Sequence, residues 1–420
     1  MAFNERIAII GLGYVGLPLA TEFAKKYKVV GYDVDMARIK ELKRGIDRTK
    51  EISQKKLLLN KNLLFTNNSN HMKNSDFFIL TVPTPITKNK KPDLSIIRKA
   101  ALNVAKVMKK GTTIILESTV YPGVTEDYLV PILEKQSKLK HKKDFFVAYS
   151  PERINPGETK YKLTNIKKIV GADDKTTLLK VSKIYKKIIK AGIHKVSSIK
   201  VAEASKAIEN AQRDINIAFV NEVMMLSEAL NINSYEVLEA ARTKWNFLDF
   251  KPGLVGGHCI GVDPYYLAEA GKKANFNTKI ILAGRNLNDS VPDYLLKNIN
   301  RKLKKNSRIL LLGLSFKEDV GDIRNSKSIE LVIKIKKKNF AIDCYDPRVD
   351  QAELERKYNL KINKPKGKYD CVIVAVAHKE FIKMNERNIL KLVKDNSYII
   401  DIKGIWSKKI SSKLKNYWCL

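Results

Sequence analysis

One cysteine lies in a segment whose composition suits a reactive thiol. Cys259 ends the run Lys-Pro-Gly-Leu-Val-Gly-Gly-His-Cys, and Asp263 and Pro264 follow closely. A thiolate can add to a carbonyl carbon and form a covalent intermediate, which divides one difficult reaction into two easier steps. A glycine-rich segment that presents a thiol, far downstream of a dinucleotide-binding pattern, therefore predicts an oxidation that passes through a thioester on Cys259.

The dinucleotide-binding pattern is a GxGxxG run between a predicted strand and a predicted helix. Gly11 permits the tight turn, Gly13 lets the backbone approach a pyrophosphate, and Gly16 lets the helix pack on the strand. Asp33 ends the next predicted strand, where its carboxylate can accept hydrogen bonds from a ribose diol and repel a 2′-phosphate. NAD is therefore favoured over NADP, although Arg38 keeps NADP open because an arginine can bind that phosphate. A Rossmann fold without a nucleotide is the other interpretation.

Three further polar residues could act with the thiol. Lys206 and Asn210 are four residues apart in a predicted helix, so they share one face, where they could stabilise an oxyanion and orient a substrate hydroxyl. Ordinary surface polarity is the competing interpretation of this pair. Glu152 follows a predicted strand at residues 145–148, which places it at the carboxyl edge of a sheet, where sites form. A turn carboxylate without a catalytic role explains Glu152 equally well.

Two other positions have both a structural and a functional interpretation. Asp263 and Pro264 suit a helix start, with Asp as the N-cap and Pro at the first position, and only the closeness of Cys259 suggests catalysis. Phe316, Lys317 and Arg324 follow a second glycine turn and could hold a diphosphate or the cofactor. A salt-bridged loop is the alternative for these three residues.

The two ends of the chain carry matching segments in the same order, and strand-like runs alternate with helical ones in both. Such alternation predicts parallel sheets with helices on both faces. Between them, residues 201–230 form a long helical pattern without Gly or Pro, which would join two lobes and suit a dimer contact. We therefore expect an α/β protein with two Rossmann-like doubly wound domains, a long central helix and a helical dimerisation region. The predicted domains are residues 1–196, 197–300 and 301–420.

Composition excludes several classes of protein. The chain has 420 residues, of which 44% are hydrophobic, and no apolar run approaches the ~18 residues that span a bilayer. We therefore expect a cytoplasmic protein without membrane insertion. The net charge of +35 would favour polyanions, but the lysines are spread along the chain and we expect no nucleic-acid partner. The scattered histidines and the absence of a CxxC pair predict no metal site.

At this point the motifs resemble those of the UDP-glucose/GDP-mannose dehydrogenases, which oxidise nucleotide sugars to uronic acids. The resemblance covers essentially the whole chain and implies two Rossmann-like domains, NAD as cofactor, a UDP-sugar substrate and a homodimer formed through the central helix. The motifs that carry it are the runs at residues 11–18, 81–85, 118–120, 150–153, 203–210, 256–264 and 316–324.

The resemblance also implies a role for each matching residue. Cys259 is the nucleophile, Lys206 stabilises the oxyanion, Asn210 holds the substrate, Asp263 and Thr119 place a water or assist proton removal, and Glu152 is the base for thioester hydrolysis. The cofactor-binding residues are Gly11, Gly13, Tyr14, Val15, Gly16, Asp33, Arg38, Thr84, Thr119 and Arg324. The substrate-binding residues are Arg153, Ile154, Lys206, Asn210, Arg213, Gly256, Phe316 and Lys317, with Lys403 as a further candidate. A basic residue from the neighbouring subunit falls near Arg242 and Lys244.

The residue before the cysteine bears on the choice of sugar. UDP-glucose enzymes usually carry Ser there, whereas His258 and its surroundings resemble the Vi-antigen and O-antigen branch, which acts on UDP-N-acetylglucosamine or UDP-N-acetylgalactosamine. This predicts an N-acetylhexosamine substrate, used to make precursors of a surface polysaccharide. UDP-glucose and UDP-N-acetylmannosamine are the alternative substrates. A two-electron hydroxy-acid dehydrogenase and a non-catalytic nucleotide-sugar or polyanion binder are the alternative functions.

Overall fold

The chain forms two compact units. The structure is a computed structural model that describes residues 5–87, 89–154, 161–410 and 416–419. The first unit comprises Met1–Glu209 and Tyr265–Asn277, and the second comprises Asn210–Pro264 and Thr278–Leu420. The predicted division into three domains stays a prediction.

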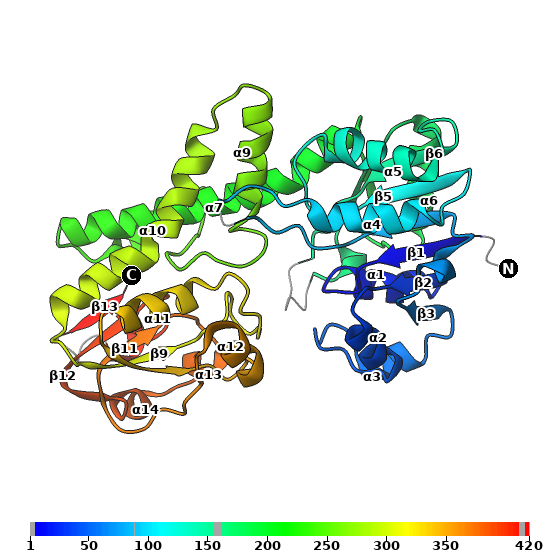
Figure 1. Cartoon of the computed structure of the whole chain (residues 1–420). Helices are drawn as coiled ribbons and strands as arrows, with labels where there is room; N and C mark the ends of the chain where they lie inside the picture. The colour runs from blue at the N-terminus through cyan, green and yellow to red at the C-terminus, as the bar shows by residue number, and fades with distance from the viewer. Residues whose placement is uncertain (1–4, 88, 155–160, 411–415, 420) are drawn as a thin grey trace. The chain divides into compact units, whose positions relative to one another are not determined.

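The first unit contains a sheet whose described part has eight strands, in the order β3-β2-β1-β4-β5-β6-β7-β8 (Figure 1). Strands β1 to β6 are mutually parallel, β7 is antiparallel to β6, and β8 is parallel to β7. The strands are β1 Arg6–Ile10, β2 Lys28–Tyr32, β3 Leu63–Thr66, β4 Phe77–Leu80, β5 Thr112–Leu116, β6 Phe145–Tyr149, β7 Lys168–Ala172 and β8 Ile193–Lys195.

Helices cover both faces of this sheet. Alternate strand residues such as Ile7 and Ile9 pack on α1 and α6, where the rings of Phe23 and Tyr185 lie 5.4 Å apart. The intervening strand residues are buried as well, as a sheet covered on both faces requires. The helical elements are α1 Gly16–Phe23, α2 Met36–Lys43, α3 Gln54–Leu58, η1 Ser69–Met72, α4 Ser95–Ala105, η2 Val124–Leu129, α5 Val130–Ser137, η3 Leu163–Asn165 and α6 Lys175–Lys186.

The long helix α7, Ile199–Ala229, confirms the helix expected at residues 201–230. It and α9, Asp263–Lys273, each contribute residues to both units. Because α9 begins at Asp263 itself, the expectation that Pro264 is its first residue is wrong by one position. The other two helices of this region are α8, Ser234–Arg242, and α10, Lys279–Lys302.

The second unit contains a parallel sheet in the order β10-β9-β11-β12-β13, counted over its described residues. Its core packs α10 and α11 against one face of the sheet. The strands are β9 Arg308–Leu312, β10 Ala341–Tyr345, β11 Tyr369–Val374, β12 Val393–Asp401 and β13 Tyr417–Cys419. The helices are α11 Lys327–Lys337, α12 Gln351–Tyr358, α13 Lys379–Ile382, α14 Glu386–Leu390 and α15 Ser407–Ile410.

The same turn follows the first strand of each sheet. Gly11 donates its N–H to the carbonyl of Tyr32 at 2.9 Å, and Gly313 donates to the carbonyl of Tyr345 at 2.9 Å. Both glycines have a left-handed backbone, with φ of 96° and 95°. The α/β class with two Rossmann-like sheets and a long central helix is thus confirmed. Within the described ranges, the helices are all too short or too polar to cross a membrane.

Candidate active site

The glycine turn of the first unit forms a cradle that fits a pyrophosphate. A Cβ added to Gly16 would overlap the carbonyl oxygen of Gly11, so the helix can start here only with glycine. A Cβ on Gly13, in contrast, would have no heavy atom within 4 Å, and that open space lies beside the start of α1. A helix N-terminus next to an open backbone suits a phosphate anion. The residues present therefore fit the dinucleotide that the sequence predicts.

Asp33 and Arg38 hold this turn from the side of β2. The Asp33 carboxylate accepts the N–H of Leu12 at 2.8 Å through Oδ2. The buried Arg38 donates from Nε to the carbonyl of Leu12 at 3.0 Å and from Nη2 to Asp47 at 2.8 Å. Both side chains support the turn, and two of the three nitrogens of the buried Arg38 guanidinium, Nε and Nη2, are bonded inside the unit.

The other predicted cofactor residues of the first unit lie near the carboxyl ends of its strands. Tyr14 and Val15 form the part of the turn that precedes α1, and both are half-buried. Thr84 follows β4 and Thr119 follows β5, and both are also half-buried. Because carboxyl ends of parallel strands share one edge of a sheet, these residues and the glycine turn belong to one edge.

Glu152 belongs to a buried cluster of charged residues. Its Oε1 accepts the N–H groups of Arg153 and Ile154 at 2.7 and 2.8 Å, and its Oε2 accepts Lys168 Nζ at 3.1 Å. Lys168 is 3% exposed and also donates to Glu117 at 2.8 Å. The turn-carboxylate interpretation is therefore incomplete, because Glu152 shares one buried ammonium with a second carboxylate.

The acid–base balance of this cluster is set by burial. Burial raises the pKa of Glu117, and the nearby negative charge of Glu152 adds to it, while the Lys168 ammonium opposes the rise. Tyr185 is hydrogen-bonded to Glu117, and burial raises its pKa well above the usual range. The four side chains form one buried hydrogen-bonded group at the carboxyl end of β5 and β6.

The second unit carries the thiol. Of the cysteines whose side chains the structure describes, Cys259 is partly exposed, whereas Cys344 and Cys371 are buried. Burial raises the pKa of Cys344 to about 12 and that of Cys371 still further, which suits inert core thiols. The carbonyl of Cys259 accepts the N–H of Asp263 at 2.8 Å, so the thiol residue lies in the turn that leads into α9, four residues before its first residue.

Asn210 and Asp263 meet beside this segment. Asn210 Nδ2 donates to Asp263 Oδ2 at 2.5 Å, and both residues are buried. Lys206 lies one turn earlier on α7, and with exposed fractions of 8% and 7% Lys206 and Asn210 are not surface residues. The interpretation of this pair as ordinary surface polarity is wrong, because a buried polar pair needs partners or a ligand.

A charged cluster adjoins the cysteine segment in the same unit. Arg324 forms an ion pair with Asp322 at 2.5 Å, and its Nη2 lies 3.3 Å from His258 Nδ1. The His258 ring meets the Phe316 ring edge-on, with centroids 5.7 Å apart. Burial opposes ionisation of Asp322, but the hydrogen bonds and charge of Arg324 outweigh it and lower the pKa of Asp322. The salt-bridged loop therefore exists, and it lies against the residue before the thiol.

Glycines let other backbone and side chains approach the cysteine segment closely. A Cβ on Gly256 would overlap the carbonyl oxygen of Asn325, and a Cβ on Gly257 would lie 2.6 Å from the Phe316 ring. A Cβ on Gly253 would lie 2.7 Å from Lys403 Nζ, so that ammonium lies beside the start of the segment.

The remaining predicted residues have ordinary positions in the two units. Arg153 forms an ion pair with Glu209 at 2.8 Å and Arg242 one with Asp249 at 2.5 Å. Lys317 is half-buried and its carbonyl accepts Ser315 Oγ at 2.8 Å. Arg213 and Lys244 are exposed and Ile154 is half-buried. The roles predicted for all these residues stay predictions.

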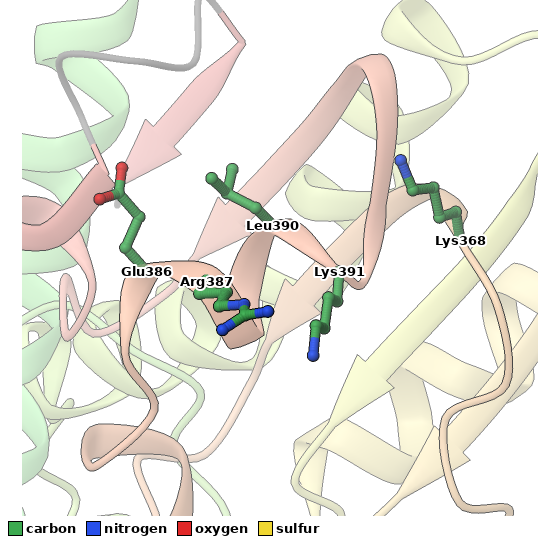
Figure 2. A pocket seen from close by; sticks show the side chains of 5 residues that line it. All are labelled: Lys368, Glu386, Arg387, Leu390 and Lys391. Atoms are coloured by element: carbon green, nitrogen blue, oxygen red, sulfur yellow. The ribbon is translucent and has the colours of Figure 1, made fainter.

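One hollow of the second unit is separate from the predicted site. It has a volume of about 460 Å³ and is lined by Lys368, Glu386, Arg387, Leu390 and Lys391. Figure 2 shows the ammonium groups of Lys368 and Lys391 pointing in different directions, so the basic side chains do not converge on one point. The predicted catalytic and binding residues are not among those that line it.

Sequence reasoning missed the buried residues that hold the site together. In the first unit, Lys168 lies between Glu152 and Glu117 and forms an ion pair with each. In the second unit, Asp214 of α7 pairs with Arg285 of α10 at 2.6 Å, and Asn221 bonds to Gly253. Their partners lie far away along the chain, so local sequence patterns carry no signal for them.

A dinucleotide-type Rossmann unit, a second Rossmann-like unit and a partly exposed thiol define a nucleotide-dependent dehydrogenase. Three family models match the chain: the NAD binding domain of the UDP-glucose/GDP-mannose dehydrogenase family at residues 5–189, its central domain at 200–290 and its UDP binding domain at 310–408. The chain belongs to the UDP-glucose/GDP-mannose dehydrogenase family. It is an NAD-dependent oxidoreductase of UDP-sugars, which confirms the predicted family, enzyme class and cofactor.

Individual relatives are similar over nearly the whole chain. The chain is 47% identical to the UDP-N-acetyl-D-glucosamine 6-dehydrogenase of Salmonella typhi and 46% identical to that of Pseudomonas aeruginosa, each over 95% of this chain and 96% of the relative. Among solved structures, a UDP-D-ManNAc dehydrogenase from Pyrococcus horikoshii matches with a TM-score of 0.87 and 32% identity, covering 99% of this chain and 98% of that one.

Proposed function

We propose that the protein oxidises C6 of UDP-N-acetylglucosamine to the carboxylate, through a thioester on Cys259, for a surface polysaccharide precursor. The observation that carries this proposal is the position of Cys259: a partly exposed thiol on a glycine-rich segment that leads into α9, where Asn210 and Asp263 meet. Identity of 46–47% to two enzymes named for this sugar supports glucosamine over its C4 epimer.

The protein's own groups supply the covalent steps. The glycine turn at residues 11–16 would hold NAD, which would supply the oxidant: one NAD for the hydride lost from the C6 alcohol, and a second NAD, bound after the first NADH has left, for the hydride lost from the later adduct. The Cys259 thiolate adds to the C6 aldehyde, a carbon–sulfur bond forms, and Lys206 stabilises the oxygen that gains the electron pair. Loss of the second hydride leaves the thioester, and water then releases the carboxylate and the thiol.

Hydrolysis of the thioester needs a group that takes a proton from water. We assign this role to Glu152, whose carboxylate is held in one orientation by three donors, two backbone N–H groups and the Lys168 ammonium. Asn210 holds the substrate at its sugar hydroxyl groups and orients Asp263. Asp263 and Thr119 place the water or assist proton removal. Arg153, Ile154, Arg213, Gly256, Phe316 and Lys317 bind the nucleotide sugar, and Arg324 binds NAD.

NAD reduction with a panel of UDP-sugars tests the proposal. UDP-N-acetylglucosamine should be oxidised faster than UDP-N-acetylgalactosamine, UDP-glucose or UDP-N-acetylmannosamine, with two NADH formed per uronic acid. Cys259→Ser should stop acid formation at or before the aldehyde, because serine lacks the nucleophilic thiolate. Faster reduction with UDP-glucose would refute the choice of sugar, and undiminished acid formation by Cys259→Ser would refute the thioester.

We also propose that a second copy of this chain covers one face of α7. Phe219 and Leu226 of α7 are exposed and, being seven residues apart, lie on one face of the helix. Leu230, the exposed residue that directly follows α7, continues this face, because its N–H bonds to the Leu226 carbonyl at 2.9 Å. Trp245, with 91% of its surface exposed, and Ile280 add apolar surface in the same unit. An exposed apolar patch of this kind is typical of a protein interface.

The oligomeric state of two aspartate variants tests the dimer. Phe219→Asp combined with Leu226→Asp should convert a dimer to a monomer in size-exclusion chromatography with light scattering. Leu179→Asp, at an exposed leucine on α6 of the first unit, is the matched control and should stay dimeric. A monomeric parent, or a double variant that stays dimeric, would refute this surface as the interface.

A further inference from the structure

A single buried arginine contacts both ends of the segment that carries the thiol. Arg285, on α10, is 0% exposed. Its Nη2 donates to the carbonyl of Val255 at 3.2 Å, and its Nη1 to the carbonyl of Ile260 at 3.5 Å. Val255 and Ile260 flank residues 256–259, so one guanidinium is bonded to the backbone on each side of Cys259.

Two carboxylates hold this guanidinium in place. Asp214 of α7 accepts Arg285 Nη1 at 2.6 Å, and Asp289 lies 3.3 Å from Nη2. Asn288 adds a hydrogen bond to the Asp214 carboxylate at 2.8 Å. A buried charge is tolerated only where it is paired and hydrogen-bonded, and this one is anchored to two helices at once. The arginine is therefore a fixed point to which the cysteine segment is attached.

The cysteine segment needs such external support because its own backbone is permissive. Gly256 and Gly257 precede His258, and glycine is conformationally freer than any other residue. Gly257 has a left-handed φ of 85°. At the start of the segment, Asn221 of α7 accepts the N–H of Gly253 at 2.8 Å and donates to its carbonyl at 3.1 Å. Contacts with α7 and α10, rather than stiffness of its own backbone, therefore hold the cysteine segment in one conformation.

We propose that Arg285 is a positioning residue that places the Cys259 thiol for attack on the C6 aldehyde, through its hydrogen bonds to Val255 and Ile260. This inference rests on the proposed thioester function. A guanidinium presents several N–H groups in a rigid planar fork, so it can bond to two carbonyls and a carboxylate at once, whereas a lysine ammonium cannot reproduce this geometry. Misplacement of a reacting group by about 1 Å can lower the rate about 10²-fold.

Arg285→Lys tests the role, with Tyr294→Phe as the matched control. Tyr294 lies on α10 and bonds to Glu228 of α7, so its variant loses a polar contact between the same two helices further along them. Arg285→Lys should lower kcat for acid formation about 10²-fold, with a much smaller change in KM and with the circular dichroism of a folded protein. The control should keep the parent kcat.

Thiol alkylation gives a second measurement that needs no sugar. In a Cys419→Ser background, iodoacetamide should modify Cys259 at a different rate in Arg285→Lys than in the parent and in Tyr294→Phe, because the loosened segment changes the access to the thiol. Equal alkylation rates and equal kcat in a folded Arg285→Lys variant would overturn the inference. A parent that forms no NADH with any UDP-sugar would instead overturn the proposed function, and the alkylation comparison would still test the arginine.

A second variant covers the case in which Arg285→Lys does not fold. Asp214→Asn combined with Arg285→Met removes the buried ion pair together with both of its charges, which is often tolerated. If the double variant folds and has low kcat with altered alkylation, the inference holds. If it folds with parental kcat and alkylation, or if neither variant folds, Arg285 serves folding alone and the inference is overturned.

Discussion

A carboxylate on the long helix should make the stability of the first unit depend on pH. Glu203 of α7 is fully buried, and its oxygens accept the N–H of Gly123 at 2.5 Å and the N–H and hydroxyl of Thr125 at 2.9 and 2.6 Å. Burial raises the pKa of Glu203 from 4.5 to about 7, and these hydrogen bonds only partly oppose the rise. The folded protein therefore holds the Glu203 proton more tightly than the unfolded chain does.

The sign and size of the effect follow from this difference. The stabilising contribution is complete below the unfolded pKa of 4.5 and is lost as the pH rises through about 7. A rise of the pKa from 4.5 to about 7 is 2.5 units, which corresponds to about 3 kcal/mol. Glu203→Gln does not titrate, but its amide leaves one buried donor without an acceptor, which costs about 1–3 kcal/mol at every pH.

Urea unfolding of the parent and Glu203→Gln between about pH 5 and about pH 8 measures this dependence. The free energy of unfolding of the parent should fall toward that of the variant as the pH rises, by up to about 3 kcal/mol. Glu222→Gln, at an exposed position on the same helix, controls for the loss of a carboxylate. Parallel curves for the parent and Glu203→Gln, or a gap that widens with pH, would refute the reasoning.

Three other perturbations have defined outcomes. Gly13→Ala should keep the melting temperature of the apoprotein but weaken NAD binding in a titration, because the added Cβ enters open space. Gly16→Ala should lower the melting temperature itself, because the added Cβ overlaps the backbone of Gly11. Equal effects of the two variants would contradict the proposed pyrophosphate cradle. Lys168→Met should cost about 3–5 kcal/mol in denaturant unfolding, because it leaves two buried glutamates without their cation; a loss below about 1 kcal/mol would contradict the pairing. Burial opposes ionisation of Asp346, but hydrogen bonds from His378 and backbone N–H groups outweigh burial and lower its pKa, so the protein should lose stability as the pH falls below 3.8. Acid unfolding followed by circular dichroism should show a less steep loss in Asp346→Asn than in the parent, and identical acid transitions would contradict this.

Local pattern was sufficient for the elements that carry the dinucleotide turn. The strand predicted before Gly11 is observed as β1, Arg6–Ile10, and the strand predicted next to Asp33 as β2, Lys28–Tyr32, because apolar β-branched runs bounded by glycine or aspartate are strong strand signals. The matching segments at the two ends of the chain correspond to β1, β2 and β4 in the first unit and to β9, β10 and β11 in the second. Short strands such as β3 and β8 were missed, because edge strands bury little and have weak periodicity.

Burial of charge could not be predicted, because it depends on partners far away in sequence. Lys168 is one of 79 lysine and arginine residues, and no sequence pattern distinguishes it, yet it lies between Glu117 and Glu152, 51 and 16 residues away. Arg285 and Asp214 are separated by 71 residues. The spacing of Lys206 and Asn210 placed both on one helix face, but only the packed structure shows that this face is buried.

The repeated turn has a consequence for how the enzyme could be re-engineered. The two units share the hydrogen bond from the turn glycine, and Asp33 and Asp346 accept the following N–H in the same way. The sequences differ two positions after the glycine, where the open Gly13 corresponds to Ser315, whose hydroxyl bonds within its own loop. One architecture thus exists in two versions with separate ligand chemistry. A substitution at Gly13 can therefore alter the dinucleotide turn of the first unit without changing the corresponding turn of the second unit, which Ser315 and Asp346 hold by their own hydrogen bonds.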